Sequence, residues 1–259
     1  MARDKIYLEE EYPSPLQQLW YNFKSIPLVM IAFGFYVFLI VLAILAPVIS
    51  PYDATINNLD VIMMPPSWSE EGNISYLLGT DDLGRDMLSR LMHGTSLTFG
   101  LSILVVIIAL FVGVIIGSLS ALSKGIKSSL LNHLLDAVLS IPSLLLAIII
   151  VAILGPGFDN TFWAIVLVLI PQFVHITRNA VSEEFSKDYV LASRLDGASS
   201  FRILSYSVFP NITDKIIIQA TLAQSVAILD IAALGFLGLG APIPMPEWGA
   251  MLSTGLDLF

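Results

Sequence analysis

YVLASRLDGASSFRILSYSVFPN, residues 189–211, is a polar stretch within a chain that is otherwise strongly apolar. Arg194 and Asp196 precede a central Gly197, and Pro210 stands near the end of the stretch. Glycine readily adopts the left-handed conformation that ends a helix, so the pattern predicts a short helix, a hinge and a second short helix. Apolar segments flank this elbow on both sides, and they define the class of fold.

Serines predict where the two helices of the elbow begin. Ser182 or Ser186 can cap the first helix, which we expect to end at Leu195. Ser199 or Ser200 can cap the second helix. The hinge therefore lies between two short helices that are too short to cross a membrane.

The second helix of the elbow is expected to stop at Phe209, because the residue before Pro210 is disfavoured in the helical conformation. Phe201, Leu204 and Val208 follow the spacing i, i+3, i+7 and would form one apolar face. An elbow with one apolar face predicts a docking surface for a soluble partner.

Composition places the chain in the membrane. Of 259 residues, 56% are apolar and 13% are charged, which is far from the composition of a soluble domain. A crossing helix needs about 20 apolar residues. We therefore expect an all-α integral membrane protein whose transmembrane domain, residues 27–259, has five visible membrane helices. They are expected at about 27–49, 93–122, 137–155, 161–178 and 213–238.

Basic residues predict the orientation, because Lys and Arg stay preferentially on the cytoplasmic side. With the N-terminus inside, only Arg85 and Arg90 of the 12 basic residues lie outside. The sequence thus predicts a cytoplasmic N-terminal segment, residues 1–26, an outer loop, residues 50–92, and a cytoplasmic loop, residues 179–211. The ten basic residues on the cytoplasmic side are Arg3, Lys5, Lys24, Lys124, Lys127, Arg178, Lys187, Arg194, Arg202 and Lys215.

Catalytic and metal-binding motifs are missing from the sequence. There is no cysteine, and His93, His133 and His175 are far apart, so neither a thiol nucleophile nor a metal site is expected. No glycine-rich phosphate loop occurs, so we expect a chain that binds no cofactor and does not hydrolyse ATP itself. Only Asp230 lies deep in an apolar stretch, which argues against an intramembrane enzyme with paired carboxylates.

Small residues predict close helix packing. Ala109, Gly113, Gly117 and Ala121 recur at intervals of four and form a smooth stripe on one helix. Such a stripe lets a second helix approach closely inside a membrane.

Three residues inside apolar stretches are candidates for a translocation pathway or gate. Pro142 and Pro171 each remove a backbone hydrogen bond from a membrane helix. Asp230 must face the bundle interior or water rather than lipid. It could contact a substrate, or it could hydrogen-bond the end of a neighbouring helix.

Acidic residues gather in the outer loop. Between Asp53 and Asp86, seven acidic residues stand against the single basic Arg85, a local charge of −6. Such a field can concentrate cations at a pore mouth. The alternative is an ordinary solvated loop.

A family resemblance begins at the elbow. DYVLASRLDGASSFRILSYSVFPN, residues 188–211, resembles the EAA loop of ABC importer permeases, which couples the membrane domain to ATPase subunits. Leu191 and Ser193 stand where the family has Glu and its second Ala. The resemblance assigns ATPase coupling to Ala192, Arg194, Asp196, Gly197, Ala198, Arg202 and Pro210.

Two further blocks narrow the resemblance to the dipeptide, oligopeptide and nickel permease branch. LGTDDLGRDMLSRLMHG, residues 78–94, and GFLGLGAPIPMPEWGAML, residues 235–252, are similar to sequences characteristic of that branch. The outer, periplasmic block contributes Gly79, Asp81, Gly84, Arg85 and Asp86.

The resemblance implies a type I ABC importer permease bundle in a bacterial inner membrane. Its expected partners are a second homologous permease, two ATPase subunits that hold ATP and Mg, a periplasmic binding protein and the lipid bilayer, with no nucleic acid. The chain would form half of a pore for peptides, cationic or antimicrobial ones in particular. Polyamines, nickel or haem are alternatives within the family, and a secondary transporter or channel is an alternative outside it.

The family also carries a sixth membrane helix. This sequence stops at LSTGLDLF, residues 252–259, so we expect the natural product to continue with a further apolar stretch of about 20 residues.

Overall fold

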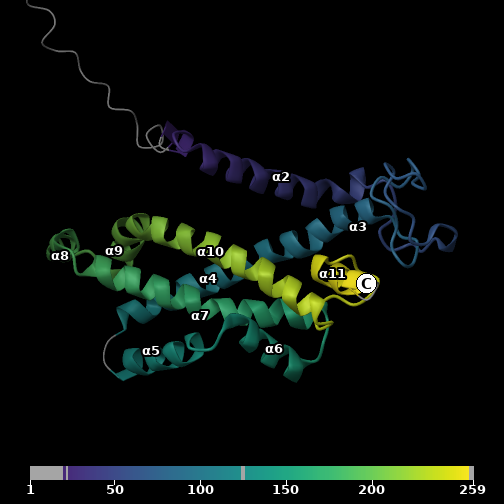
Figure 1. Ribbon diagram of the computed structural model, residues 1–259. Helices are drawn as coiled ribbons and strands as arrows, with labels where there is room; N and C mark the ends of the chain where they lie inside the picture. Colours follow the sequence, from purple (N-terminus) through teal and green to yellow (C-terminus); the bar gives the residue numbers. More distant parts are fainter. Residues whose placement is uncertain (1–19, 22, 124–125, 257–259) are drawn as a thin grey trace, which may run out of the picture.

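A computed structural model describes residues 20–21, 23–123 and 126–256 of the chain (Figure 1). These residues are helical or lie in loops, and they form no β-strand. Four of the described helices are long and apolar enough to cross a membrane, or five if one bent pair counts as a single span. The predicted all-α membrane fold is confirmed. Most of the predicted N-terminal segment, residues 1–26, lies outside the described residues, as do Lys124 and residues 257–259.

The chain order of the helices is as follows. The elements are α2 (Pro27–Ile49), the 3₁₀ turn η1 (Leu59–Val61), α3 (Met87–Gly94), the π-helix η2 (Thr95–Gly100), α4 (Leu101–Leu122), α5 (Ile126–Leu139), α6 (Ser143–Leu154), α7 (Phe158–Phe185), α8 (Asp188–Leu195), α9 (Ser200–Ile203), the π-helix η3 (Leu204–Val208), α10 (Phe209–Phe236) and α11 (Trp248–Leu256).

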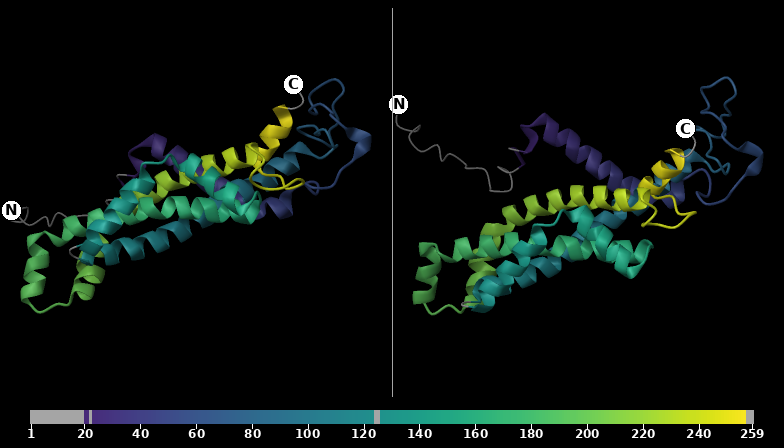
Figure 2. Two further views of the ribbon diagram at one scale, coloured as in Figure 1. Left: turned by 90° about the horizontal axis from the view of Figure 1, so that it is seen from below. Right: turned by 60° about the horizontal axis from the view of Figure 1, so that its bottom comes forward.

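Helices α4, α7 and α10 form the centre of the bundle, and α5 and α6 pack along α7 (Figure 1). The short helices α8 and α9 lie at one end of the bundle, which we call the elbow end. The loop of residues 50–86 and α11 lie together at the opposite end, which we call the loop end. The elbow lies between α7 and α10 in the chain and is held by these two helices. Figure 2 shows that α2 stands away from this half of the bundle.

The contact between α4 and α7 is the tightest in the core. A Cβ atom added at Gly113 would lie 2.3 Å from Cβ of Phe173, and one added at Gly117 would lie 2.8 Å from Cβ of Thr177. Both distances are too short for any side chain, so the two backbones touch across the glycines. The close helix approach predicted from the small-residue stripe is confirmed.

Two buried clusters fill the bundle. The larger one lies between α4, α6, α7 and α10 and includes the fully buried Phe173 and Leu169. The smaller one lies toward the elbow end, where Val181 of α7 packs with Val208 and Ile212. The second cluster attaches the elbow to the membrane helices.

Helix α2 touches the bundle at few points. The Ser96 hydroxyl donates a hydrogen bond to the Ala43 carbonyl, and the Tyr36 and Phe99 rings meet edge to face at 5.2 Å. Among the residues of α2, only Ala46 is buried. Most of the apolar surface of α2 is therefore free to contact lipid or another chain.

Some predicted helix bounds differ from the structure. The expected single helix over residues 137–155 is broken into α5 and α6, which meet at an angle of 95°. Pro142 lacks an amide hydrogen and disfavours a helical Ile141, so the break falls directly before it. Pro171 lies inside the continuous α7, where neighbouring helices tolerate it.

The helix expected at 27–49 matches α2 at both ends, and the other three helices begin earlier than expected. The helix expected at 93–122 begins at Met87 and forms one span of 36 residues with α3, η2 and α4. The helix expected at 161–178 covers Phe158–Phe185. The helix expected at 213–238 is α10, and it continues without interruption from α9 and η3.

The glycine contact leads to a first prediction. Gly113→Leu should overpack the α4–α7 contact and cost about 1–3 kcal/mol, because backbone atoms of α7 cannot move aside. The midpoint of thermal unfolding of the detergent-solubilised protein should fall by several degrees. Gly34→Leu on α2 is the matched control, since no atom lies within 4 Å of the added Cβ. Equal midpoints for the two variants would contradict the packing argument.

Candidate functional site

The elbow has a well-defined hinge. Gly197 has a φ of +84°, the left-handed conformation predicted for it. The Gly197 amide donates to the Arg194 carbonyl at 3.0 Å, and the Ala198 amide donates to the Ser193 carbonyl at 3.0 Å. These two bonds form a Schellman motif, which ends α8 and turns the chain toward α9.

One predicted cap is confirmed and one is wrong. The Ser199 hydroxyl accepts a hydrogen bond from the Arg202 amide at 3.3 Å and caps α9. The first elbow helix is not capped by Ser182 or Ser186, because α7 runs through to Phe185 and α8 begins after Lys187.

The second elbow helix does not stop at Phe209, as the sequence led us to expect. The chain passes through the π-helix η3 and continues through Pro210 into α10. Pro210 occupies the first turn of α10, where a proline is tolerated. The wider π-helical turn immediately before it accommodates the proline ring without breaking the helix.

The predicted apolar docking face is also wrong in part. Leu204 and Val208 are buried in the cluster beside α7, so they anchor the elbow and are not available to a partner. Phe201 remains 75% exposed, and Leu195 and Tyr206 are each 81% exposed. Sequence spacing identified the apolar face, but only the packing of η3 on α7 shows which side of it is covered.

A cavity of about 480 Å³ lies inside the elbow. Asp196, Gly197, Ala198 and Arg202 line it, together with Tyr206 and neighbouring residues. Four residues that the family resemblance assigned to ATPase coupling are thus brought together around one hollow. The remaining three, Ala192, Arg194 and Pro210, lie on the surfaces of α8 and α10.

Buried polar contacts fix α8 to the long helices. Glu184 of α7 is 3% exposed, and its carboxylate accepts hydrogen bonds from the Tyr189 hydroxyl at 2.6 Å and from Lys187 Nζ at 2.7 Å. Asn211 of α10 in turn donates to the Tyr189 hydroxyl at 3.4 Å. Burial and the bond to Glu184 raise the pKa of the Tyr189 hydroxyl, so it stays protonated and remains a donor. The elbow is therefore attached to both α7 and α10.

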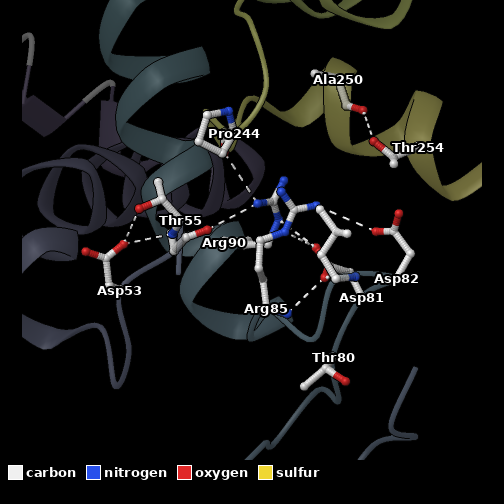
Figure 3. A network of polar contacts seen from close by, with 12 residues as sticks. Asp53, Thr55, Thr80, Asp81, Asp82, Arg85, Arg90, Pro244, Ala250 and Thr254 are labelled. Atoms are coloured by element: carbon white, nitrogen blue, oxygen red, sulfur yellow. Dashed lines mark hydrogen bonds and ion pairs between the residues drawn. The ribbon is translucent and has the colours of Figure 1, made fainter. Parts of the chain in front are cut away.

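At the loop end, the LGTDDLGRD segment forms a clasp of charged side chains (Figure 3). The Asp81 carboxylate accepts from the Arg85 amide at 2.9 Å and from Arg85 Nε at 2.7 Å, and it lies 3.4 Å from Arg90 Nε. Arg90 Nη1 donates to the carbonyls of Ala54 at 3.1 Å and Pro244 at 3.5 Å. The clasp thus joins the loop, α3 and the segment before α11.

The other predicted residues of this block shape its backbone. Gly79 and Gly84 have φ values of +78° and +72°, and neither has room for a side chain. Asp86 caps α3 by accepting from the Ser89 amide at 2.8 Å. Asp81 is paired with two arginines, and Asp86 is buried and bound by Ser89, so neither carboxylate is exposed on the loop to attract cations.

Glu247 is a site residue that the sequence analysis missed. It is 2% exposed, accepts from the Thr98 hydroxyl at 2.9 Å, and caps α11 through the Gly249 and Ala250 amides at 2.9 Å. A Cβ at Gly235 would meet the Glu247 carboxylate at 1.9 Å, so glycine is needed there. The sequence signal for this cap was an acidic residue directly before WGAML, because a carboxylate is stabilised at the N-terminus of a helix.

Asp230 lies in the interior of the bundle, 5% exposed, on α10. Its carboxylate contacts the Ser143 hydroxyl at the start of α6, directly after Pro142. The second carboxylate oxygen has no hydrogen-bond partner among the described residues. The break in the membrane span and the buried acid are therefore neighbours.

The described residues thus form a helical membrane bundle with an elbow of short helices at one end and a clasped loop at the other. The chain belongs to the family described as the inner membrane component of binding-protein-dependent transport systems, which it matches over residues 113–257. Residues 14–66 match a second family, the N-terminal TM domain of oligopeptide transport permease C. The predicted family resemblance is confirmed.

Curated relatives cover the whole length of this chain. It is 45% identical over 258 residues to the peptide transport system permease protein SapC of Escherichia coli O6:H1, covering 100% of this chain and 87% of that protein. It is 46% identical to the di/tripeptide transport system permease protein DppC of Pseudomonas aeruginosa, covering 95% of this chain and 81% of that protein.

A solved structure shares the fold. The methionine ABC transporter MetNI, in an inward-facing conformation, matches with a TM-score of 0.53 and 17% identity, over 66% of this chain and 88% of that chain. The predicted ABC importer permease bundle is confirmed.

The clasp leads to a second prediction. Asp81→Asn should take from the buried Arg85 its nearest carboxylate, at 2.7 Å, and leave it only the partly exposed Asp82 at 3.6 Å. Breaking a buried pair costs about 3–5 kcal/mol, and the remaining contact with Asp82 reduces that cost. The thermal midpoint should fall, and limited proteolysis should cut residues 50–86 faster. The control is Asp60→Asn, because Asp60 is exposed in the same loop. A variant with wild-type cleavage rates would show that the clasp does not hold the loop.

Proposed function

We propose that the chain is the membrane-spanning subunit of an ATP-driven peptide transporter in a bacterial inner membrane. It forms half of the translocation pore, and a second homologous permease forms the other half. Two ATPase subunits bind ATP and Mg and dock on the elbow, and a periplasmic binding protein delivers the peptide. The chain itself is not catalytic. The relatives named above, which are peptide and di/tripeptide permeases, support the substrate class.

The elbow is the observation that carries this proposal. Leu195, Phe201 and Tyr206 expose large apolar side chains at a point where the protein projects from the bundle (Figure 1). Large apolar side chains exposed together at one end of a protein favour a protein–protein contact there. Because Glu184 and Asn211 attach the elbow to α7 and α10, movement of a docked ATPase is passed directly to two membrane helices.

Charge supports the orientation of the elbow toward the cytoplasm. Lys187, Arg194, Arg202 and Lys215 lie at or near the elbow end, whereas Arg85 and Arg90 at the loop end are engaged in the clasp. Lys and Arg are preferentially retained on the cytoplasmic side. The loop end then faces the periplasm and the binding protein.

Cationic peptides are the proposed substrates. The chain has a net charge of −9, and the loop keeps Asp53, Asp60, Glu70 and Glu71 exposed outside the clasp. Asp230 is a further acid, placed beside the broken span in the bundle interior. We propose that it faces the pathway when the bundle opens, with Pro142 and Pro171 on the helices that move.

A third prediction tests the coupling elbow. In Gly197→Val a β-branched residue would have to adopt a positive φ, at a cost of roughly 1–3 kcal/mol, which would displace α8 from α9. Stimulation of ATP hydrolysis by the binding protein and peptide should be lost in the reconstituted complex. Membrane insertion of the permease should be unchanged.

Gly238→Val is the matched control for this variant. Gly238 also has a positive φ, +72°, and also has no atom within 4 Å of an added Cβ, but it lies at the loop end. It should retain ATP-driven transport more fully than Gly197→Val. Full coupled transport by Gly197→Val would remove the ATPase assignment.

A fourth prediction concerns Asp230. Asp230→Asn removes the charge with little change in shape, so transport of cationic peptides should fall by roughly 10- to 150-fold, as expected for a lost charge-assisted contact of about 1.5–3 kcal/mol. Neutral peptides of the same length should be affected much less. Equal loss for both classes, accompanied by poor assembly, would show that Asp230 serves only to hold α6 against α10.

A further inference from the structure

A line of polar side chains runs along the elbow-end halves of α7 and α10. Gln172, His175 and Asn179 share one face of α7, since their spacing is i, i+3, i+7. Gln219 of α10 donates to the Gln172 side chain at 3.4 Å, and the Asn179 and His175 side chains are 2.9 Å apart. His175 also lies 4.0 Å from Asp136 of α5. We call these five residues the polar seam.

The polar seam runs from the middle of the membrane span of α7 to its elbow end, where Asn179 and Asp136 lie at the expected cytoplasmic boundary. Gln172 is at the middle of the 28-residue α7, and His175 is about 4.5 Å closer to the elbow end at 1.5 Å per residue. The His175 side chain is 41% exposed and that of Asp136 is 62% exposed. Polar and ionisable side chains at the depth of Gln172 and His175 are costly against lipid, so they face the bundle interior or a water-filled cavity. The exposed side of the seam therefore faces water.

Other faces of the same helices are suited to lipid or to a protein partner. Leu167 of α7 is 51% exposed, and Ile217 of α10 is 58% exposed. Each of the two helices thus has a polar face and an apolar face, and side chains on both faces are exposed in this chain.

The broken span adjoins the seam. Asp136 lies one turn before the break at Ser140–Pro142, and α5 packs against α7. Ile141 and Pro142 are exposed at the break. Irregular backbone at membrane depth is tolerated where it is buried in protein or lines a water-filled cavity, and interrupted helices of this kind border substrate sites in transporters. An exposed break beside exposed polar side chains indicates the same water-filled space.

We infer that the polar seam lines the elbow-end half of the translocation pathway and that Gln172 and Gln219 contact the main chain of a passing peptide. A carboxamide carries both donors and acceptors, so it can pair with peptide groups whatever the peptide sequence. The bond between the two glutamines is long at 3.4 Å, and either side chain can exchange it for a peptide amide. This inference rests on the proposed function, because it assumes that peptides pass through the chain.

None of the 259 residues is a cysteine, which makes a direct test possible. Single variants Gln172→Cys, His175→Cys and Gln219→Cys would be assembled with cysteine-free partner subunits in inside-out vesicles. A membrane-impermeant, positively charged methanethiosulfonate reagent modifies only cysteines that water reaches. The controls are Leu167→Cys on α7, about 7.5 Å along the helix from Gln172, and Ile217→Cys on α10, about 3 Å from Gln219, and both place a cysteine on an exposed apolar face.

Seam positions should react at least tenfold faster than the controls, and saturating peptide should slow modification at positions 172 and 219. Rates no faster than those of the controls, in both the nucleotide-free and the ATP-bound complex, would overturn the inference. Transport and coupled ATP hydrolysis measured on the cysteine-free parent separate the two proposals. An active parent with an unreactive seam contradicts only the pathway. A reactive seam without protection by peptide contradicts the role of the glutamines.

Discussion

The close approach of α4 and α7 is the contact on which the rest of the bundle depends. Lipid tails are as apolar as the side chains of membrane helices, so helices associate there through tight packing and not through a hydrophobic driving force. Gly113 and Gly117 allow backbone contact with Phe173 and Thr177, and this pair of helices provides the surface on which α6 and α10 pack. The elbow and the seam are then placed by α7 and α10.

The two ends of the bundle are held by buried polar groups with different consequences. At the elbow end, the Glu184 carboxylate of α7 accepts hydrogen bonds from Tyr189 and Lys187, and Asn211 of α10 donates to the Tyr189 hydroxyl. A force on the short helices would therefore be transmitted to α7 and α10. Those same helices carry four of the five residues of the polar seam, so the surface proposed to receive the ATPase and the surface proposed to carry the peptide share α7 and α10. At the loop end, Asp81 and Glu247 fasten the loop and α11 to the start of the second span.

The broken span stands apart from this framework. Helix α5 lies at the edge of the bundle (Figure 1). The turn at Ser140–Pro142 interrupts the helix between α5 and α6. Ser143 contacts Asp230 on one side of the break, and Asp136 approaches His175 on the other. A bundle whose core helices are tightly packed and whose peripheral helix is interrupted can open beside the break without losing the α4–α7 contact.

Local backbone chemistry was enough to predict several features from the sequence alone. Length and composition determined the membrane class, and Gly197 determined the hinge, because each depends on residues close together in the chain. The tertiary structure alone decided that Pro142 breaks a span whereas Pro171 does not, that Leu204 is covered, and that Asp81 is paired and not free. These outcomes depend on which distant residues lie opposite each group, and neither periodicity nor local spacing contains that information.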